Sequence, residues 1–142
     1  MDRLETLRQR VRTFLDELGI DSEETNPGLH VLRYGSTIVT VSTFVEGNET
    51  FCRFATIMLT EFAPNLDLLQ RLLRLNTEVL FGSFLLFEDD TLSFSATLLG
   101  NHLDADEFDV ALRYVAGIAD EFDDELQALG GGRRGADLLD TP

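Results

Sequence analysis

Hydrophobic and polar positions repeat along the chain with two different periods, which predict a fold that mixes helices and strands. In residues 2–19 the apolar positions recur at steps of three and four, as they do on one side of an amphipathic helix. In residues 92–98 leucine, phenylalanine and alanine alternate with serine and threonine, as they do along a half-buried strand. The remaining patterns predict two more helices, over residues 65–76 and 104–129, and four more strands, over residues 30–34, 37–45, 50–62 and 79–87. The expected fold is therefore α+β, with the order α-βββ-α-ββ-α and an antiparallel five-stranded sheet.

Local signals refine the ends of these elements and the extent of the domain. Asp104 is followed three positions later by Glu107, which is the spacing of a capping box at the start of the third helix. The polar stretch at residues 21–28 is expected to be a loop. Residues 1–129 are predicted to form a single domain, and the glycine-rich residues 130–142 are predicted to form a flexible tail.

One face of the predicted sheet carries almost no charge. The core face should bury Val39, Val41, Val45, Leu92, Phe94, Ala96 and Leu98. The opposite face should present Phe44, Phe54 and Met58 among the hydroxyl side chains of Thr40, Ser42, Thr56, Ser93, Ser95 and Thr97. Uncharged hydroxyls mixed with aromatic rings suit a surface that another chain covers part of the time, so Phe44, Phe54 and Met58 are candidate partner-binding residues. The alternative is that serine and threonine simply tolerate an exposed strand face.

The helix predicted over residues 65–76 is apolar around a wide arc. At about 100° per residue its leucines spread over roughly 180° of the helix surface, whereas a helix packed on one sheet needs a stripe of only about 100°. One side of this arc would contact the protomer's own core and the other side a second copy of the chain. The two sides consist of Leu66, Leu69 and Leu73 and of Leu68, Leu72 and Leu75. The predicted dimer-interface residues are Leu68, Leu69, Leu72 and Leu75, and the alternative is burial of the whole helix within one domain.

The charge of the chain is strongly negative. Its 142 residues include 26 acidic and 11 basic side chains, for a formal net charge of −15, and every basic residue is arginine. Such a surface repels phosphate backbones and anionic lipids, which argues against direct binding of nucleic acid or membranes and favours basic protein partners. On the third helix, Asp120, Asp123 and Asp124 form either a docking surface for a basic partner or a solvated face.

The expected location is the cytoplasm. No basic segment precedes an apolar run at the N-terminus, as it would in a signal peptide. The longest apolar run, residues 79–87, is far shorter than the roughly 20 residues that a membrane-spanning helix needs.

Side chains that could perform catalysis or bind a metal are few and scattered. The two histidines, His30 and His102, have no further histidine or cysteine beside them at metal-ligand spacing. The single cysteine, Cys52, lies in a predicted strand, where cysteine is usually buried and unreactive. No nucleotide-binding or nucleophile motif is present. The sequence therefore predicts no enzyme activity, no bound metal and no cofactor.

The second half of the chain carries a set of packing residues in a specific order. A leucine-rich helix ends in Asn76, Phe81-Gly82 is followed by Phe84 and an acidic turn, and the last helix, entered by Leu103 and Asp104, carries Val115, Ala119 and Asp120. In these residues the chain resembles the YbjN family of small bacterial proteins, and the rest agrees in the order of its elements. The resemblance implies the fold of the small class I chaperones of type III secretion, which are usually homodimers that bind extended segments of a partner protein. It also implies that the second helix takes part in dimer contacts, and it supplies no catalytic residues.

The leading hypothesis is a non-enzymatic, homodimeric protein- or peptide-binding module that acts as a chaperone-like adaptor or regulator of one or a few partner proteins. The partner would lie along the uncharged sheet face or in an adjoining groove, and the acidic third helix would steer basic partners toward it. The alternative is a small-molecule sensor with a pocket between the third helix and the sheet.

Overall fold

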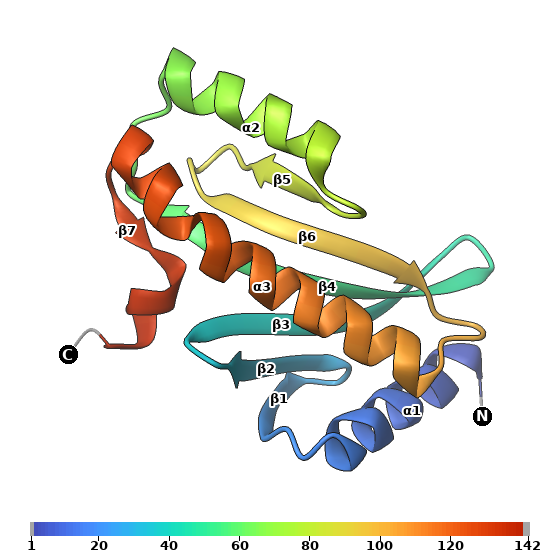
Figure 1. Ribbon diagram of the computed structural model, residues 1–142. Coiled ribbons are helices and arrows are strands. Elements are labelled where there is room, and N and C mark those ends of the chain that lie inside the picture. The colour runs from blue at the N-terminus through green and yellow to red at the C-terminus, as the bar shows by residue number, and fades with distance from the viewer. Residues whose placement is uncertain (1, 141–142) are drawn as a thin grey trace.

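An antiparallel sheet of seven strands forms the centre of the computed structural model, which describes residues 2–140 (Figure 1). The helices are α1 (Arg3–Glu17), α2 (Leu66–Glu78), α3 (Ala105–Gly130) and the short 3-10 helix η1 (Gly135–Asp140). The strands are β1 (Ser22–Asn26), β2 (Leu29–Tyr34), β3 (Thr37–Glu46), β4 (Glu49–Thr60), β5 (Ser83–Leu86), β6 (Leu92–Leu99) and β7 (Arg133–Arg134). The strand order is β1-β2-β3-β4-β6-β5, and β7 pairs with the end of β4.

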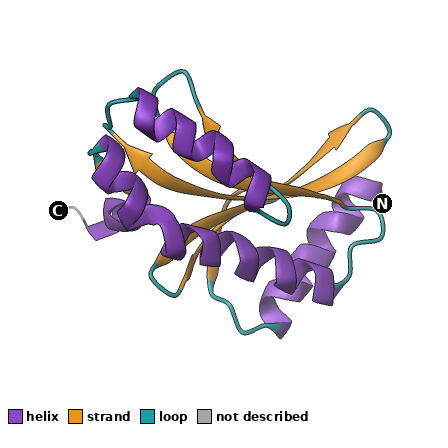
Figure 2. Ribbon diagram, turned by 45° about the horizontal axis from the view of Figure 1, so that its top comes forward, coloured by secondary structure: helices purple, strands orange, loops and turns teal. Residues whose placement is uncertain are grey.

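The three long helices pack on one side of this sheet, as Figures 1 and 2 show. Helices α1 and α3 lie against β3 and β4, while α2 lies against β5 and α3. The core between the helices and the sheet is aromatic at its centre, where the rings of Phe54 and Phe108 meet edge to face at a centroid distance of 5.1 Å. The α+β fold and its element order are therefore as predicted.

The register of the three central strands decides which side chains reach this core. Val41 of β3 lies opposite Phe54 of β4, which in turn lies opposite Ala96 of β6, and all three are buried. Because side chains alternate along a strand, the even positions of β4 from Cys52 to Met58 point to the helices, and a register shift after Ile57 brings Leu59 into the core as well. The odd positions, Phe51, Arg53, Ala55 and Ile57, reach the uncovered side, which we call the open face. The predicted faces of β3 and β6 are confirmed except near the hairpin end, where Val45 is 47% exposed and Leu98 is only partly buried, and the predicted face of β4 is wrong.

The sheet has two strands more than predicted, and one predicted strand is shorter. Strand β1 forms in the polar stretch that was expected to be a loop, where it pairs with β2 at the sheet edge. Strand β7 adds two residues beside β4. Of the strand predicted over residues 79–87, only Ser83–Leu86 pairs with β6, because the preceding residues turn the chain from α2 into the sheet.

The turn between α2 and β5 explains several residues of the family pattern. The side-chain amide of Asn76 accepts a hydrogen bond from the Phe84 backbone nitrogen at 2.7 Å and donates one to the Phe84 carbonyl oxygen at 3.3 Å. Gly82 has a φ of +84°, and a Cβ at this position would come within 2.7 Å of the Ser95 carbonyl oxygen. Phe81 stacks on Tyr114 of α3 at a centroid distance of 4.6 Å. These residues fix β5 to the sheet and to α3, which is a structural role.

The start of α3 is capped as predicted, and the segment that follows α3 lies against the sheet. Asp104 accepts a hydrogen bond from the Glu107 backbone nitrogen at 2.7 Å, and the Glu107 carboxylate accepts one from the Asp104 nitrogen at 3.4 Å, which confirms the capping box. Residues 130–142 were expected to be a flexible tail. In the structure, Arg133–Arg134 pairs with Leu59 and Thr60 of β4, and η1 follows against the sheet. Residues 141–142 lie outside the described part of the chain.

A cluster of charged side chains joins α1 to the edge of the sheet. Arg12 donates two hydrogen bonds of 2.9 Å to the carboxylate of Glu24, which also accepts one from the Gly28 nitrogen at 3.0 Å. These bonds lower the pKa of Glu24 to about 2. His30 is buried beside them, with its Nδ1 atom 3.4 Å from the hydroxyl of Ser22, and burial lowers the pKa of His30.

This cluster predicts two pH windows for stability. The pKa of His30 is lower in the folded state than in the unfolded state. As the pH falls below the ordinary pKa of about 6.5, the unfolded chain therefore binds a proton at His30 before the folded chain does. The free energy of unfolding should therefore decrease as the pH falls below that value, by at most about 1.4 kcal/mol per pH unit from this group. The stabilisation from Glu24 is present above its ordinary pKa of 4.5 and is lost as the pH falls toward about 2.

Urea denaturation at several pH values measures the first window. His30→Leu should remove most of the decrease in stability that the wild type shows as the pH falls from about 6.5 to about 5.5. An equal decrease in the wild type and in His30→Leu would show that His30 does not titrate abnormally.

Candidate functional site

The open face of the sheet is nearly free of acidic side chains, although the chain has a net charge of −15. In residues 29–33, 38–44, 51–57, 83–87 and 93–97, the side chains that alternate onto this face are aliphatic, aromatic, serine or threonine, apart from Arg33 and Arg53. Acidic side chains come at its margins, with Glu23 on the edge strand and with Glu46 opposite Glu49 at the tip of the β3–β4 hairpin. The open face is thus distinct in charge from the rest of the molecule.

A row of side chains crosses this face beside the hairpin. Phe44 and Phe51 lie opposite each other in the register of β3 and β4, and their rings stack at a centroid distance of 5.5 Å. The guanidinium of Arg53 lies over the Phe44 ring at 4.7 Å and donates a hydrogen bond of 3.0 Å to the hydroxyl of Thr97 on β6. The row holds one positive charge flat against an aromatic surface.

Two hollows lie along the open face and share Ala55 and Ser93 as lining residues. The η1 hollow has a volume of about 350 Å³, and its other lining residues include Ile38, Ile57 and Leu138. The β5 hollow has a volume of about 630 Å³ and is lined by Arg53, Gly82, Ser83, Leu85, Phe87, Ser95 and Thr97 as well. Because they share lining residues, we treat them as one surface, the open-face groove. Arg53 is the only charged side chain among these lining residues.

The predicted partner-binding residues are not brought together. Phe44 lies on the open face, half-buried, as expected. Phe54 and Met58 are instead in the core, with exposed fractions of 0% and 1%, because the register of β4 turns its even positions toward the helices. Phe51 and Ile57 take their place on the open face. The sequence gives only a weak signal for placing Phe51 and Ile57 on this face, because β4 carries apolar residues at both odd and even positions over much of its length. A shift of one residue in the pairing of such a strand exchanges its two faces.

The acidic residues proposed for docking lie on α3, which packs on the opposite side of the sheet from the groove. Asp120 and Asp124 are exposed, and Asp124 accepts a hydrogen bond of 2.6 Å from Arg134. Asp123 is partly buried, and burial together with the neighbouring Asp124 raises its pKa. These acids do not border the groove, and their role in attracting a basic partner stays a prediction.

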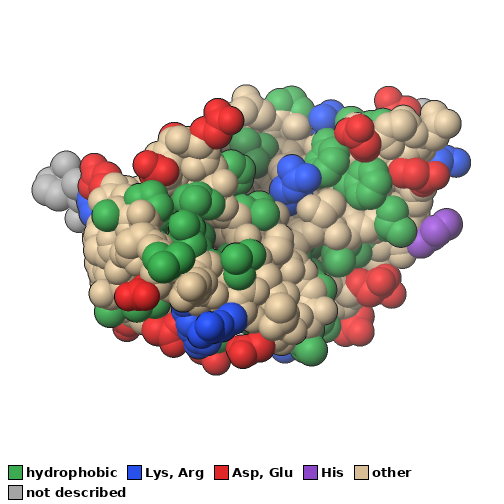
Figure 3. Space-filling model, turned by 90° about the horizontal axis from the view of Figure 1, so that it is seen from above, with side chains coloured by type: hydrophobic (Ala, Val, Ile, Leu, Met, Phe, Trp, Pro, Cys, Tyr) green, Lys and Arg blue, Asp and Glu red, His purple; other side chains and the backbone are tan. Residues whose placement is uncertain are grey.

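The leucines of α2 divide into two sets, as the wide apolar arc indicates. Leu68, Leu72 and Leu75 are buried in the protomer's own core, so these three cannot form a dimer contact while this fold is intact. Leu69 is half-buried. Leu66 and Leu73 are 69% and 70% exposed, and Leu80 in the following turn is 83% exposed. Figure 3, which looks down from the top of Figure 1, shows hydrophobic side chains gathered over this part of the surface.

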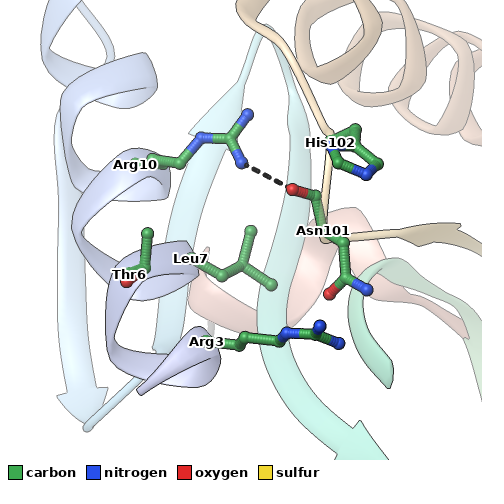
Figure 4. Close-up of a pocket in the computed structure, with 7 residues that line it drawn as sticks. Arg3, Thr6, Leu7, Arg10, Asn101 and His102 are labelled. Carbon is green, nitrogen blue, oxygen red and sulfur yellow. Dashed lines mark hydrogen bonds between the residues drawn. The ribbon is translucent and has the colours of Figure 1, made fainter. Parts of the chain in front are cut away.

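Other hollows lie outside the groove, and one of about 620 Å³ lies beside the β3–β4 hairpin, where Arg3 and Val45 are among its lining residues. A second, of about 220 Å³, lies between α1 and the loop after β6, where Arg3, Arg10 and His102 surround it and Arg10 donates a hydrogen bond of 3.3 Å to the Asn101 carbonyl oxygen (Figure 4). Another of about 200 Å³ lies where α3 meets the β2–β3 turn. Small-molecule sites commonly occupy about 300–1,000 Å³. The hollow beside α3 is below this range, whereas the hairpin hollow and the open-face groove are within it, so volume argues only against a sensor pocket between α3 and the sheet.

Reactive and metal-binding groups add no chemistry to these surfaces. Cys52 is fully buried, and burial raises the pKa of its thiol to about 12. Within residues 2–140, no three side chains of histidine, cysteine, aspartate or glutamate are grouped as a metal site. In the same residues, no helix has the length and apolar character needed to cross a membrane.

Similar solved structures share the fold at low sequence identity. A chain of the heterodimeric ExoU–SpcU complex of the Pseudomonas aeruginosa type III secretion system matches with a TM-score of 0.63 and 15% identity, over 82% of this chain and 97% of that one. A chain of the complex between the Yersinia pestis type III secretion chaperone SycH and a stable fragment of YscM2 matches with a TM-score of 0.61 and 17% identity, over 81% of this chain and 98% of that one. YbjN from E. coli matches with a TM-score of 0.58 and 18% identity, over 82% and 91%.

Comparison by sequence gives the family. No curated protein matches the chain. A family model described as type III secretion system (YopN, CesT) and YbjN peptide-binding chaperone 1 matches residues 5–138, which is nearly the whole chain. The chain therefore belongs to the family of type III secretion and YbjN peptide-binding chaperones.

Proposed function

We propose that this protein is a non-enzymatic, chaperone-like adaptor that binds a segment of a partner protein in the open-face groove. The observation that carries this proposal is a hollowed, nearly acid-free sheet face on a chain with a net charge of −15. The description of the family as peptide-binding chaperones agrees with it. The cytoplasm is the proposed location, and one or a few proteins are the proposed partners.

Apolar side chains on this face would supply much of the binding energy. Ile57 is 41% exposed and Phe87 is 50% exposed, so both lose apolar contact with water when a segment covers them. Full burial of such a side chain is worth about 1.5–3 kcal/mol, and the exposed part contributes a corresponding share. Micromolar binding corresponds to about 8 kcal/mol, so apolar contacts of this size would have to extend along the whole groove and be joined by polar ones.

Polar side chains in the groove would satisfy the backbone of the bound segment. Thr40 and Thr97 carry hydroxyls at the surface of the open face, and a hydroxyl both donates and accepts hydrogen bonds. Ser93 and Ser95 line the groove at its floor, where their exposed fractions are 5% and 8%. A bound backbone needs both kinds of partner when water leaves it. The mixture of hydroxyls and apolar side chains therefore suits an extended or turning peptide better than a purely apolar ligand.

Selection from a phage-displayed library of random dodecapeptides tests the groove directly. The wild type should enrich binding peptides, and Phe44→Asp should weaken the binding of those peptides at least about tenfold, which corresponds to about 1.4 kcal/mol. The physical reason is that Phe44 stacks on Phe51 and supports Arg53 at one end of the groove. Fluorescence anisotropy of the selected peptides measures the change.

Val110→Asp is the matched control, because Val110 is also an exposed apolar side chain but lies on α3. It should bind the same peptides with unchanged affinity. The groove proposal fails if no peptide is enriched, or if Phe44→Asp and Val110→Asp bind as the wild type does.

The dimer that we propose uses the exposed side of α2. Leu66 and Leu73 lie two helical turns apart on one side of the helix, with the half-buried Leu69 between them. A patch of this kind can pair with its own copy across a two-fold axis. Because the groove lies on the opposite side of the sheet, dimer formation would leave it open.

Sedimentation equilibrium tests this interface. The wild type should sediment as a dimer, and Leu73→Asp should sediment as a monomer with an unchanged circular dichroism spectrum, since the added charge lies on an exposed position. Leu72→Asp should instead lose the fold, because its charge would enter the core.

Arg74→Asp places a carboxylate on the same helix, about 100° around it from Leu73 and not on an apolar position, and it should remain dimeric. A Leu73→Asp protein that is still a dimer would exclude this side of α2 as the interface.

A further inference from the structure

The chain after α3 crosses from the helix side of the sheet to the open face. Gly130, Gly131 and Gly132 end the helix, and β7 then pairs Arg133 with Thr60 and Arg134 with Leu59. On one side of β4, Leu59 pairs with Leu92 of β6. Strand β7 therefore lies on the other side of β4, the side that pairs with β3 earlier in the strand. The following helix η1 contacts β3 and β4.

Glycine is required where this segment meets the sheet. Gly135 is buried, and a Cβ at this position would overlap the carbonyl group of Ile57. Gly132 has a φ of +81°, and its Cβ would overlap the carbonyl oxygen of Thr60. At Gly132 and Gly135 the backbone of the terminal segment therefore approaches the backbone of β4 more closely than a residue with a Cβ atom could.

Charged groups hold η1 in this place. Arg134 donates hydrogen bonds of 2.9 and 3.1 Å to the carboxylate of Asp137 and one of 2.6 Å to Asp124 of α3. The same bonds lower the pKa of Asp137. The Arg134 side chain thus links Asp137 of η1 to Asp124 near the end of α3.

Leu138 lies against the groove that we propose for the partner. It lines the η1 hollow together with Ile38, Ala55 and Ile57, all from the open face. The hollow still has a volume of about 350 Å³ with Leu138 in place, so η1 covers one wall and leaves room for further apolar groups. Helix η1 therefore lies in the η1 hollow as a covalently attached ligand would, and it fills the hollow only in part.

We infer that η1 is a tethered occupant of the open-face groove, and that the partner segment that replaces it has the same chemistry, a short turn in which aspartate is followed by leucine. This inference rests on the proposed function and specifies its ligand. Leucine suits the apolar hollow, where Leu138 already lies. The carboxylate of Asp137 is bound by Arg134 of the same segment, so the aspartate stabilises the turn itself. Arg53, the charged side chain that lines the adjoining β5 hollow, favours an acidic group over a basic one. A tethered segment acts at an effective concentration of roughly millimolar, so it lowers the apparent affinity of a free competitor.

A peptide with the sequence of residues 133–140, RRGADLLD, labelled with fluorescein, tests the inference on the full-length chain. Gly135→Ala removes the close approach to Ile57 and should release η1, so this variant should bind the peptide at least about tenfold more tightly than the wild type. Gly117→Ala is the matched control, because a Cβ at Gly117 meets no atom within 4 Å, and it should bind as the wild type does. Fluorescence anisotropy gives the dissociation constants.

A second variant and a second peptide keep the test decisive. Leu138→Asp leaves the glycines intact but places a carboxylate at the apolar hollow, and it should also bind the free peptide more tightly than the wild type. The peptide RRGADDLD, with the same change, should bind none of the variants.

Each outcome separates this inference from the function on which it rests. Tighter binding to both released variants supports the tethered occupant. Equal binding to the wild type and to both variants overturns it, as does no binding of RRGADLLD to any variant while library-selected peptides still bind in a Phe44-dependent way. If neither the peptide nor the library binds any variant, the proposed function and this inference both fail.

Discussion

The pairing of β4 with a strand on each side is the constraint on which the rest of the structure depends. Once Phe54 lies opposite Val41 on one side and Ala96 on the other, the side chains of the three central strands alternate between the core and the open face as far as Ile57, after which a register shift places both Met58 and Leu59 in the core. The helices then cover the core side, and the end of β4 that extends past β3 receives β7. Core, groove and terminal segment are thus consequences of one register.

Strong local patterns predicted most of the fold, and weak or two-sided ones did not. The alternation in β6 and the capping box at Asp104 follow directly from the sequence. Strand β4 misled the prediction because both of its faces carry apolar side chains, one for the core and one for the groove. Strand β1 has no apolar residue, so its pairing depends on backbone hydrogen bonds and on the contact between Arg12 and Glu24, which no periodicity reveals.

The candidate site was predictable in kind but not in its residues. The sequence indicates an uncharged sheet face and an α2 helix with too much apolar surface, and both features are present. Which leucines remain outside depends on the angle at which α2 meets β5 and α3, and that angle is a tertiary property. The glycines after α3 resemble those of a disordered linker, but Gly132 and Gly135 are needed for close contact between two backbones. Composition cannot separate these two uses of glycine.

The buried thiol of Cys52 provides a built-in reporter of motion within the sheet. It lies between Thr43 and Leu98 in the register, at the centre of the molecule and on the core side. A reagent that attacks thiolates can reach it only when the central strands separate from the helices, whereas departure of η1 uncovers the other face and leaves it shielded. The rate of alkylation at this single cysteine therefore distinguishes opening of the whole domain from exchange of the segment that lies on its surface.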